Sequence, residues 1–250
     1  MSRHQFALYI YDVTALLQAL PSHGRLCISS KDIHHRITRV LRLQSGDSLI
    51  LFDRTVHVVA SIDRIAPRDE IDFVVGSAQK NNLYAPSITV ALPLLKREAL
   101  ESAVYGLTEV GVTTIQLITT EKGQQRWQGE KEYDRLQRII IAAAEQAKNF
   151  ALPVLFEPIS LKDFIDVQRT FKNNKTIFFE PTGTAAAKLI PSLSCDIQQF
   201  TLLIGPEADL SEHEKQLLAK ADVTFCSLTP TILRAQQAAI LGAAMFRILR

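Results

Sequence analysis

The sequence predicts a two-domain α/β protein whose C-terminal domain contains a mostly parallel β-sheet. After residue 77, six short apolar runs alternate with helical patterns, the order expected for a parallel sheet with helices on both faces. Before that point, short strand-like runs follow one another closely, which is typical of a small barrel or curled sheet. The polar stretch at residues 77–86 ends in proline and separates the two patterns. We therefore expect domains at residues 1–76 and 77–250.

The composition is that of an ordinary globular protein, with 47% hydrophobic and 22% charged residues among 250. The net charge of +2 does not by itself indicate nucleic-acid binding, so such a function would depend on local basic patches. No run approaches the roughly 18 consecutive apolar residues of a membrane-spanning helix, and we expect no membrane partner and no signal peptide. The three cysteines are scattered without metal-ligand spacing, which predicts a cytoplasmic protein without a metal site.

The N-terminal domain is expected to contain a helix followed by short strands. The helix spans Lys31–Leu43, and a turn at Gly46-Asp47 precedes the first strand. The helix residues that share one apolar face are Ile33, Ile37, Val40 and Leu41. The strands are expected at Ser48–Phe52, Val56–Ile62 and Ile71–Val75.

The C-terminal domain is expected to alternate strands with helices. Gly111 should end one helix, and Ser211 with Glu214 has the spacing of a capping box that begins another. The expected strands are Ile88–Leu92, Thr113–Thr119, Val154–Phe156, Thr176–Phe179, Phe200–Ile204 and Thr224–Leu228. The expected helices are Lys96–Val110, Lys131–Asn149, Leu161–Thr170, Ala185–Leu189, Ser211–Ala221 and a last one from about Ala238 to the C-terminus.

Two of these strands end in tight turns near the C-terminus. Gly205-Pro206-Glu207 follows the first strand, and Thr229-Pro230 follows the second. Ligands of open α/β sheets bind in a crevice beside the carboxyl ends of the strands, so these turns predict a binding site. The generic nucleotide, hydrolase and metalloprotease motifs are absent, so the turns do not by themselves identify a ligand.

Several segments resemble the RsmE family in both order and spacing. They are HHRITRVLR, SGDSLILFD, LTEVGV, EQAKNFALP, LLIGPEADLSEHE and LTPTILRAQQAA. That family methylates N3 of a uridine in small-subunit (16S) ribosomal RNA with S-adenosylmethionine. The resemblance covers nearly the whole chain. It implies an RNA-binding, PUA-like β-barrel at residues 1–76, a SPOUT domain with a knotted C-terminal chain at residues 77–250, and a homodimer.

The resemblance also implies which residues form the site. The turns would supply backbone contacts, and apolar side chains would flank the adenine of the cofactor. Glu207 and Arg234 are the catalytic candidates, because the uracil N–H must lose its proton. The expected cofactor-binding residues are Glu180, Ile204, Gly205, Pro206, Leu228, Thr229, Pro230, Ile232 and Leu233. The expected RNA-binding residues, which could equally form a solvated helix face, are Arg3, Arg36, Arg39 and Arg42.

The chain departs from the family pattern at positions near the predicted site. Two glycines of the family sequence GPEGG are replaced by Ala208 and Asp209, and a glycine of the following loop is replaced by Thr229. The segment Ala235–Gln237 stands where the family has TET. Two alternatives therefore remain open: a SPOUT-like RNA- or cofactor-binding protein that has lost turnover, and a SPOUT methyltransferase with a different RNA target.

Overall fold

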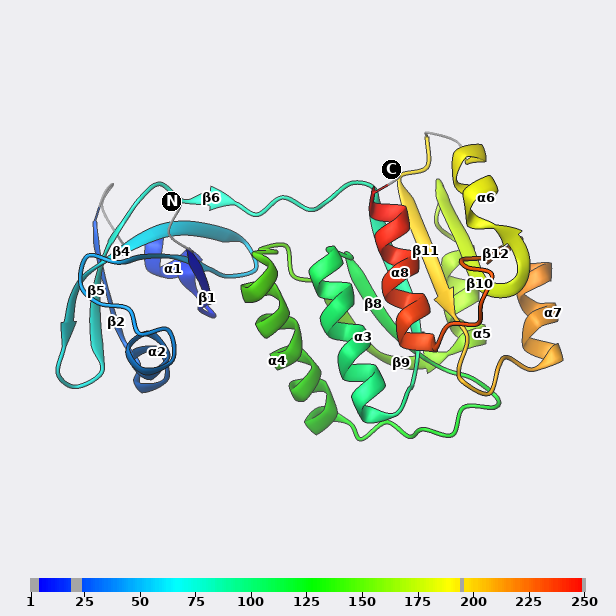
Figure 1. Cartoon of the computed structure of the whole chain (residues 1–250), viewed down its shortest axis with the longest axis horizontal. Helices are drawn as coiled ribbons and strands as arrows, with labels where there is room; N and C mark the ends of the chain where they lie inside the picture. Colours follow the sequence, from blue (N-terminus) through cyan, green and yellow to red (C-terminus); the bar gives the residue numbers. More distant parts are fainter. Residues whose placement is uncertain (1–4, 19–23, 194–195, 249–250) are drawn as a thin grey trace. The chain divides into compact units, whose positions relative to one another are not determined.

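The computed structural model describes residues 5–18, 24–193 and 196–248 (Figure 1). They divide into two compact units, the first made of Met1–Asn82 with Ala144–Ala151 and the second of Leu83–Ala143 with Leu152–Arg250. The division falls within the polar stretch 77–86 and not directly after residue 76. In addition, the first unit includes a segment that lies far along the sequence, which a single boundary could not predict.

The first unit is built around a six-stranded sheet. Its strands are β1 (Phe6–Tyr9), β2 (Arg25–Ser29), β3 (Ser48–Phe52), β4 (Val56–Ala66), β5 (Glu70–Val75) and β6 (Gln79–Lys80). Their order is β1-β3-β4-β5-β2, with β6 beside β4, and all pairs are antiparallel except β1 with β3. The three strands expected from the sequence are confirmed, whereas β1 and β2 were not predicted. Within the described residues β1 and β2 remain the two ends of this path, so no closed barrel is found.

The helix expected at Lys31–Leu43 is shorter and changes its winding. It consists of α2 (Lys31–His35) and one π-helical turn, η1 (Arg36–Val40), and a shorter helix α1 (Val13–Gln18) precedes it. In η1 the N–H of Leu41 donates to the carbonyl of Arg36, five residues earlier. The wider turn changes which side chains face the sheet. Ile37 is fully buried, but Val40 is 62% exposed, so its expected position on the apolar face is wrong.

The second unit confirms the predicted parallel sheet. Its strands are β7 (Ser87–Pro93), β8 (Thr114–Thr119), β9 (Val154–Ser160), β10 (Asn174–Ala185), β11 (Gln199–Ile204) and β12 (Thr224–Ser227). They lie in the order β12-β10-β11-β7-β8-β9, and every neighbouring pair is parallel. The central strand β11 is buried on both faces, which explains its unbroken apolar sequence from Phe200 to Ile204.

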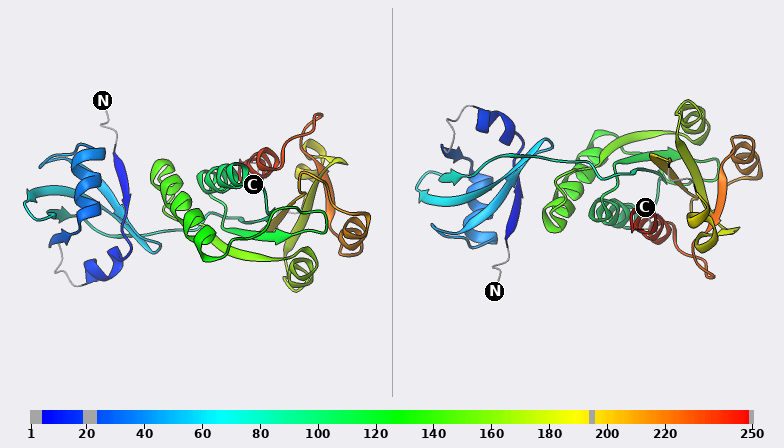
Figure 2. Two further views of the ribbon diagram at one scale, coloured as in Figure 1. Left: turned by 90° about the horizontal axis from the view of Figure 1, so that it is seen from below. Right: turned by 90° about the horizontal axis from the view of Figure 1, so that it is seen from above.

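Helices cover both faces of this sheet, with α3 and α8 on one and α5 and α7 on the other (Figure 2). The helices are α3 (Arg97–Val110), α4 (Glu130–Ala147), α5 (Leu161–Gln168), α6 (Ala186–Ser192), α7 (Glu212–Lys220) and α8 (Ala235–Ile248). Both predicted caps are present: Gly111 ends α3 in the left-handed conformation, and Ser211 with Glu214 forms a capping box on α7. No helix in the described part of the chain is long and apolar enough to cross a membrane.

Strand β10 continues beyond its expected end at Phe179. Its pairing with β12 shifts after Phe179 and resumes at Thr184, which lies beside Cys226. Between these points Gly183 lies so close to the backbone of Phe225 and Cys226 that a Cβ atom would overlap it. Glycine is therefore required for the chain to pass β12 here.

Candidate functional site

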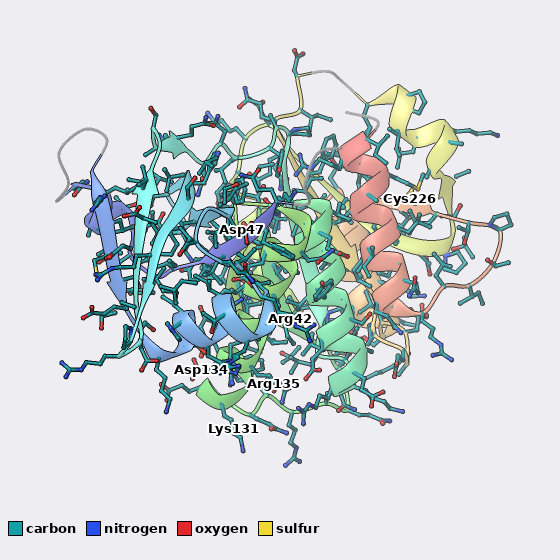
Figure 3. The ribbon with its side chains drawn as sticks, turned by 60° about the vertical axis from the view of Figure 1, so that its left-hand side comes forward. Arg42, Asp47, Lys131, Asp134, Arg135 and Cys226 are labelled. Atoms are coloured by element: carbon teal, nitrogen blue, oxygen red, sulfur yellow. The ribbon has the colours of Figure 1, made fainter. Side chains whose placement is uncertain are left out.

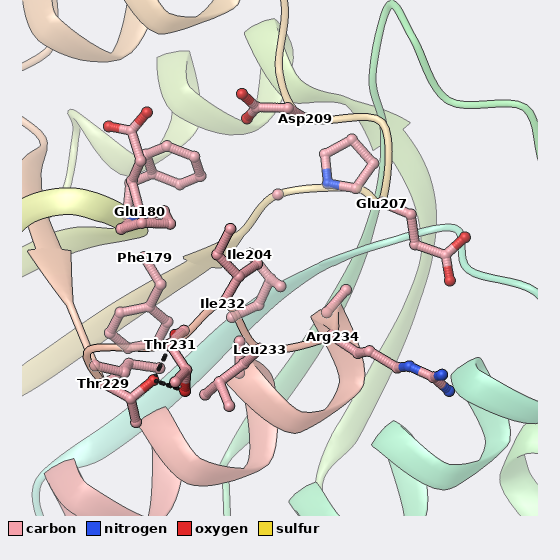
Figure 4. Close-up of a pocket in the computed structure, with 17 residues that line it drawn as sticks. Phe179, Glu180, Ile204, Glu207, Asp209, Thr229, Thr231, Ile232, Leu233 and Arg234 are labelled. Atoms are coloured by element: carbon pink, nitrogen blue, oxygen red, sulfur yellow. Dashed lines mark hydrogen bonds between the residues drawn. The ribbon is translucent and has the colours of Figure 1, made fainter.

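A pocket of about 470 Å³ opens beside the carboxyl ends of β10, β11 and β12 (Figure 4). Three segments that are far apart in the sequence form it. Strand β10 contributes Phe178, Phe179, Glu180 and Pro181, and the turn after β11 contributes Ile204, Gly205, Pro206, Glu207 and Asp209. The loop after β12 and the start of α8 contribute Leu228, Thr229, Thr231, Ile232, Leu233, Arg234, Ala235 and Ala238.

The inner part of the pocket is apolar. Phe178, Phe179 and Ile204 are buried, and Leu228 and Leu233 are half-buried. Strands β10 and β11 are parallel neighbours, and Phe179 on β10 lies opposite Ile204 on β11. This pairing brings the two side chains to the same end of the sheet. Such a surface suits a flat, apolar part of a ligand. Ile232, by contrast, is 85% exposed, so it lies at the rim and does not form an inner wall.

One side of the pocket carries a bridge of charged side chains. The Nζ atom of Lys215, on α7, lies 2.7 Å from Oε1 of Glu180 and 2.8 Å from Oδ2 of Asp209. The hydrogen bonds to Asp209 and then to Glu180 raise the pKa of Lys215 well above its usual value. Burial acts to raise the pKa of Asp209, but the hydrogen bonds from Lys215 and the N–H of Leu210 outweigh it and lower that pKa. Both shifts favour the charged forms of Lys215 and Asp209.

Asp209 also shapes the turn. Its backbone is left-handed, with φ of +60°, and its Oδ1 accepts a 2.7 Å hydrogen bond from the N–H of Leu210. Aspartate is one of the few residues other than glycine that adopt this conformation readily. The replacement of a family glycine by Asp209 is therefore compatible with the turn. The turn is held from outside as well, because Nζ of Lys122 donates a 3.0 Å hydrogen bond to the carbonyl of Leu210.

The other side of the pocket carries Glu207 and Arg234. Both are exposed, and Figure 4 shows both side chains extending away from Glu180 on the same side of the pocket. Within the described residues neither side chain forms an ion pair with a neighbour. The pocket thus has one side where charges are paired and another where a carboxylate and a guanidinium are available to a ligand.

Comparison with known proteins identifies the family of this unit. A family model described as an RNA methyltransferase domain matches residues 83–247. The chain belongs to this family. Its relatives include the ribosomal RNA small subunit methyltransferase E of Rickettsia conorii, 27% identical over 92% of both chains, and that of Mesomycoplasma hyopneumoniae, 25% identical over 81% of this chain and 86% of the other. These relatives confirm the resemblance predicted from the sequence.

Solved structures agree with the fold of this RNA methyltransferase. A ribosomal RNA small subunit methyltransferase E from Neisseria gonorrhoeae, bound to S-adenosyl methionine, is 19% identical and superimposes with a TM-score of 0.82 over 98% of both chains. A protein of Porphyromonas gingivalis described as a probable rRNA-methyltransferase is 25% identical, with a TM-score of 0.78 over 98% of both chains. The two likenesses extend over nearly the whole chain and so include both units.

Most site residues predicted for this RNA methyltransferase lie together. Of the expected cofactor-binding residues all except Pro230 line the pocket, and so do Glu207 and Arg234. Their roles remain predictions. The residues that sequence reasoning missed include Phe178, Phe179 and Thr231. Phe178 and Phe179 immediately precede Glu180 at the end of a strand predicted to be parallel, and this was the signal that could have revealed them.

The predicted RNA-binding arginines have different surroundings in the first unit. Arg3 lies outside the described residues. The guanidinium of Arg36 lies 2.6 Å from Oε2 of Glu145, whose other oxygen accepts a 2.8 Å hydrogen bond from the N–H of Tyr9. Arg39 and Arg42 are exposed, and Arg42 follows the helix α2–η1 (Figure 3). Arg36 is thus engaged within the unit, whereas Arg39 and Arg42 are open to a ligand.

Proposed function

We propose that this protein transfers a methyl group from S-adenosylmethionine to N3 of a uridine in small-subunit ribosomal RNA. The observation that carries the proposal is the pocket at the carboxyl ends of β10, β11 and β12, which lies within the segment that matches the family. Relatives named ribosomal RNA small subunit methyltransferase E support the class of substrate. The resemblance in sequence supports the uracil nitrogen as the acceptor.

The residues of the pocket fit this cofactor. Small-molecule pockets have volumes of roughly 300–1,000 Å³ and are mostly apolar with a few polar anchors. A volume of about 470 Å³ with Phe178, Phe179 and Ile204 inside matches that description. The backbone of Gly205-Pro206 offers hydrogen-bonding groups without side-chain bulk. When bound, S-adenosylmethionine would supply the electrophilic methyl group on its sulfonium.

Glu207 and Arg234 are suited to the acceptor nitrogen. Methylation at N3 of uracil requires loss of the N3 proton, so a base must accept it or a donor must stabilise the resulting anion. A carboxylate can accept the proton, and a guanidinium can hold the negative charge or an RNA phosphate. The two groups extend on the same side of the pocket, away from the Glu180 side. Proximity and orientation within the pocket supply much of the remaining acceleration.

The first unit serves in RNA binding under this proposal, as a PUA-like domain. The exposed Arg39 and Arg42 support that role, because arginines neutralise phosphates without reading sequence. A uridine stacked in a helix would be out of reach of the pocket. The target is therefore an unstacked nucleotide in a single-stranded or loop region.

The resemblance extends the proposal to a knotted C-terminal chain, a homodimer and a cytoplasmic location, where small ribosomal subunits are found. The close passage of Gly183 past Phe225 and Cys226 supports a tightly wound chain in this region. Leu241 and Ile248 on α8 are exposed apolar residues, as a helix at a subunit contact would have.

Calorimetry followed by a transfer assay tests the proposal. The protein is titrated with S-adenosylmethionine and then incubated with the cofactor and small-subunit particles, and N3-methyluridine is measured by mass spectrometry of the digested RNA. Binding together with N3-methyluridine supports the proposal. Binding without transfer would instead support the binding-only alternative, and methylation of another RNA would support the second alternative. The absence of cofactor binding would contradict the assignment of the pocket.

A further inference from the structure

Lys215 connects two acidic residues of the pocket without lining the pocket itself. It projects from the first part of α7, and its ammonium contacts Glu180 on β10 and Asp209 on the turn after β11. The Lys215 side chain is 21% exposed and that of Glu180 is 15% exposed, so both are largely shielded from water. Figure 4 shows Glu180 and Asp209 on the side of the pocket away from Glu207 and Arg234.

The bridge restricts the position of the Glu180 carboxylate. An ammonium with two carboxylate partners is held more firmly than one with a single partner, because each contact is a charge-assisted hydrogen bond. Asp209 is itself held, since its other oxygen accepts the N–H of Leu210. The turn, the helix and the strand are therefore tied at one point, and Glu180 lies at the end of that chain of contacts.

The bridge also determines what Glu180 can recognise. Lys215 contacts only Oε1, and no described residue donates a hydrogen bond to Oε2. A carboxylate has about four acceptor positions, so the remaining ones are available to a ligand. Because Lys215 holds one oxygen of Glu180, the other oxygen is presented to the pocket in a fixed position, where it can accept hydrogen bonds from hydroxyl groups of a ligand. Among the parts of S-adenosylmethionine, the ribose diol has that chemistry.

We infer that Lys215, anchored by Asp209, is a positioning residue that fixes the Glu180 carboxylate as the acceptor for the ribose hydroxyls of the cofactor. This inference rests on the proposed function, since it assumes that an adenosyl group occupies the pocket. It gives Asp209 a purpose beyond compatibility with the turn, because a glycine at that position could not anchor the ammonium.

The test measures the affinity of two ligands for each variant by calorimetry. S-adenosylhomocysteine and its 2′,3′-dideoxy analogue carry the same charged groups, so a purely electrostatic effect of removing Lys215 would change both affinities equally. The analogue lacks the hydroxyls. Lys215→Met should weaken S-adenosylhomocysteine roughly three- to tenfold, the effect of a disturbed charge-assisted hydrogen bond, and should leave the affinity for the analogue unchanged. Lys220→Met, an exposed position on the same helix, is the control and should change neither affinity.

A second variant tests the same role of the bridge without replacing Lys215. Asp209→Asn keeps an oxygen for the N–H of Leu210 and a residue type that tolerates the left-handed backbone, but it removes the charge that anchors Lys215. Asp209→Asn should also weaken binding of S-adenosylhomocysteine and leave the affinity for the dideoxy analogue unchanged. This variant keeps the test decisive if Lys215→Met does not fold.

The outcomes separate this inference from the function on which it rests. Wild-type protein that binds neither ligand would overturn the proposed function. Wild-type protein that binds S-adenosylhomocysteine, with equal affinity in Lys215→Met and Asp209→Asn, would overturn the positioning role alone. An equal loss for the dideoxy analogue would overturn the assignment of Glu180 to the ribose.

Discussion

The hydroxyl of Thr229 donates a 2.7 Å hydrogen bond to the carbonyl of Thr231, closing the loop that forms one wall of the pocket. Thr229 stands where the family has a glycine, so in this chain a side chain performs part of the task of setting the loop conformation. Thr229→Val removes the hydrogen bond at nearly constant shape and should weaken binding of S-adenosylmethionine about threefold, the effect of losing one exposed hydrogen bond. Calorimetry measures it. Thr229→Ser keeps the hydroxyl, and a loss equal to that of valine would contradict this explanation.

Gly205 lines the pocket next to Phe178. A Cβ atom at this position would lie 3.5 Å from the Phe178 ring, an ordinary van der Waals distance, so a larger residue does not prevent folding. Because Phe178 lines the pocket, we expect the methyl groups of Gly205→Val to occupy ligand volume and to abolish cofactor binding in calorimetry. Gly76→Val is the matched control in the other unit, since its Cβ would lie 3.5 Å from the Val59 carbonyl oxygen. Retained affinity in Gly205→Val would mean that the ligand binds elsewhere.

Asp53 makes the stability of the first unit dependent on acidity. Burial acts to raise its pKa, but hydrogen bonds from the Thr14 hydroxyl and from the N–H groups of Val56, Thr55 and Thr14 outweigh it, so the pKa of Asp53 lies below its usual value. A depressed pKa in the folded state contributes stability that is present above the unfolded-state pKa of about 3.9 and is lost as the pH falls through the folded-state pKa.

We therefore expect Asp53→Asn to lower the free energy of unfolding at pH 7 by about 2–3 kcal/mol, because buried donors lose a charged acceptor. The difference from the wild type should shrink as the pH is lowered below about 4, in denaturant titrations at several pH values. Asp63→Asn removes a surface ion pair with Arg25 and should change stability by less than about 1 kcal/mol. A constant effect of Asp53→Asn at all pH values would show that its charge is not the cause.

The arginines of the first unit should fall into two classes. Arg39→Ala and Arg42→Ala should weaken RNA binding and each reduce the slope of log affinity against log salt by about 1, because each removes one phosphate contact. Arg36→Ala breaks the ion pair with Glu145 and should lower thermal stability instead. Fluorescence anisotropy with a labelled RNA measures the first effect, and thermal unfolding measures the second. An unchanged salt slope in both Arg39→Ala and Arg42→Ala would contradict the phosphate role.

Sequence patterns predicted the fold best where local signals agree with tertiary packing. Strand β11 has an apolar run for its full length, and α7 has the capping box that its sequence indicates. Strands β1 and β2 were not predicted because each is stabilised by pairing with a strand that is distant in the sequence, as Phe6 of β1 pairs with Leu49. The π-helical turn at Arg36–Val40 could not be predicted from the sequence either. A regular α-helical period places Val40 on the buried face, whereas in the structure this side chain is exposed.

The sequence predicted where the site lies but not which side chains contact one another there. The turns at Gly205 and Thr229 indicated where a ligand binds, because parallel strands end together at one edge. The bridge from Lys215 to Glu180 joins residues 35 positions apart, and no periodicity connects them.

Methyl transfer to small ribosomal subunits measures the proposed activity most directly. The protein is incubated with S-adenosylmethionine labelled in its methyl group and with particles that lack the modification, and the RNA is digested and analysed by mass spectrometry. We expect label in N3-methyluridine with the wild type and none with Gly205→Val. Cofactor binding by the wild type with no labelled nucleoside in the RNA would contradict it.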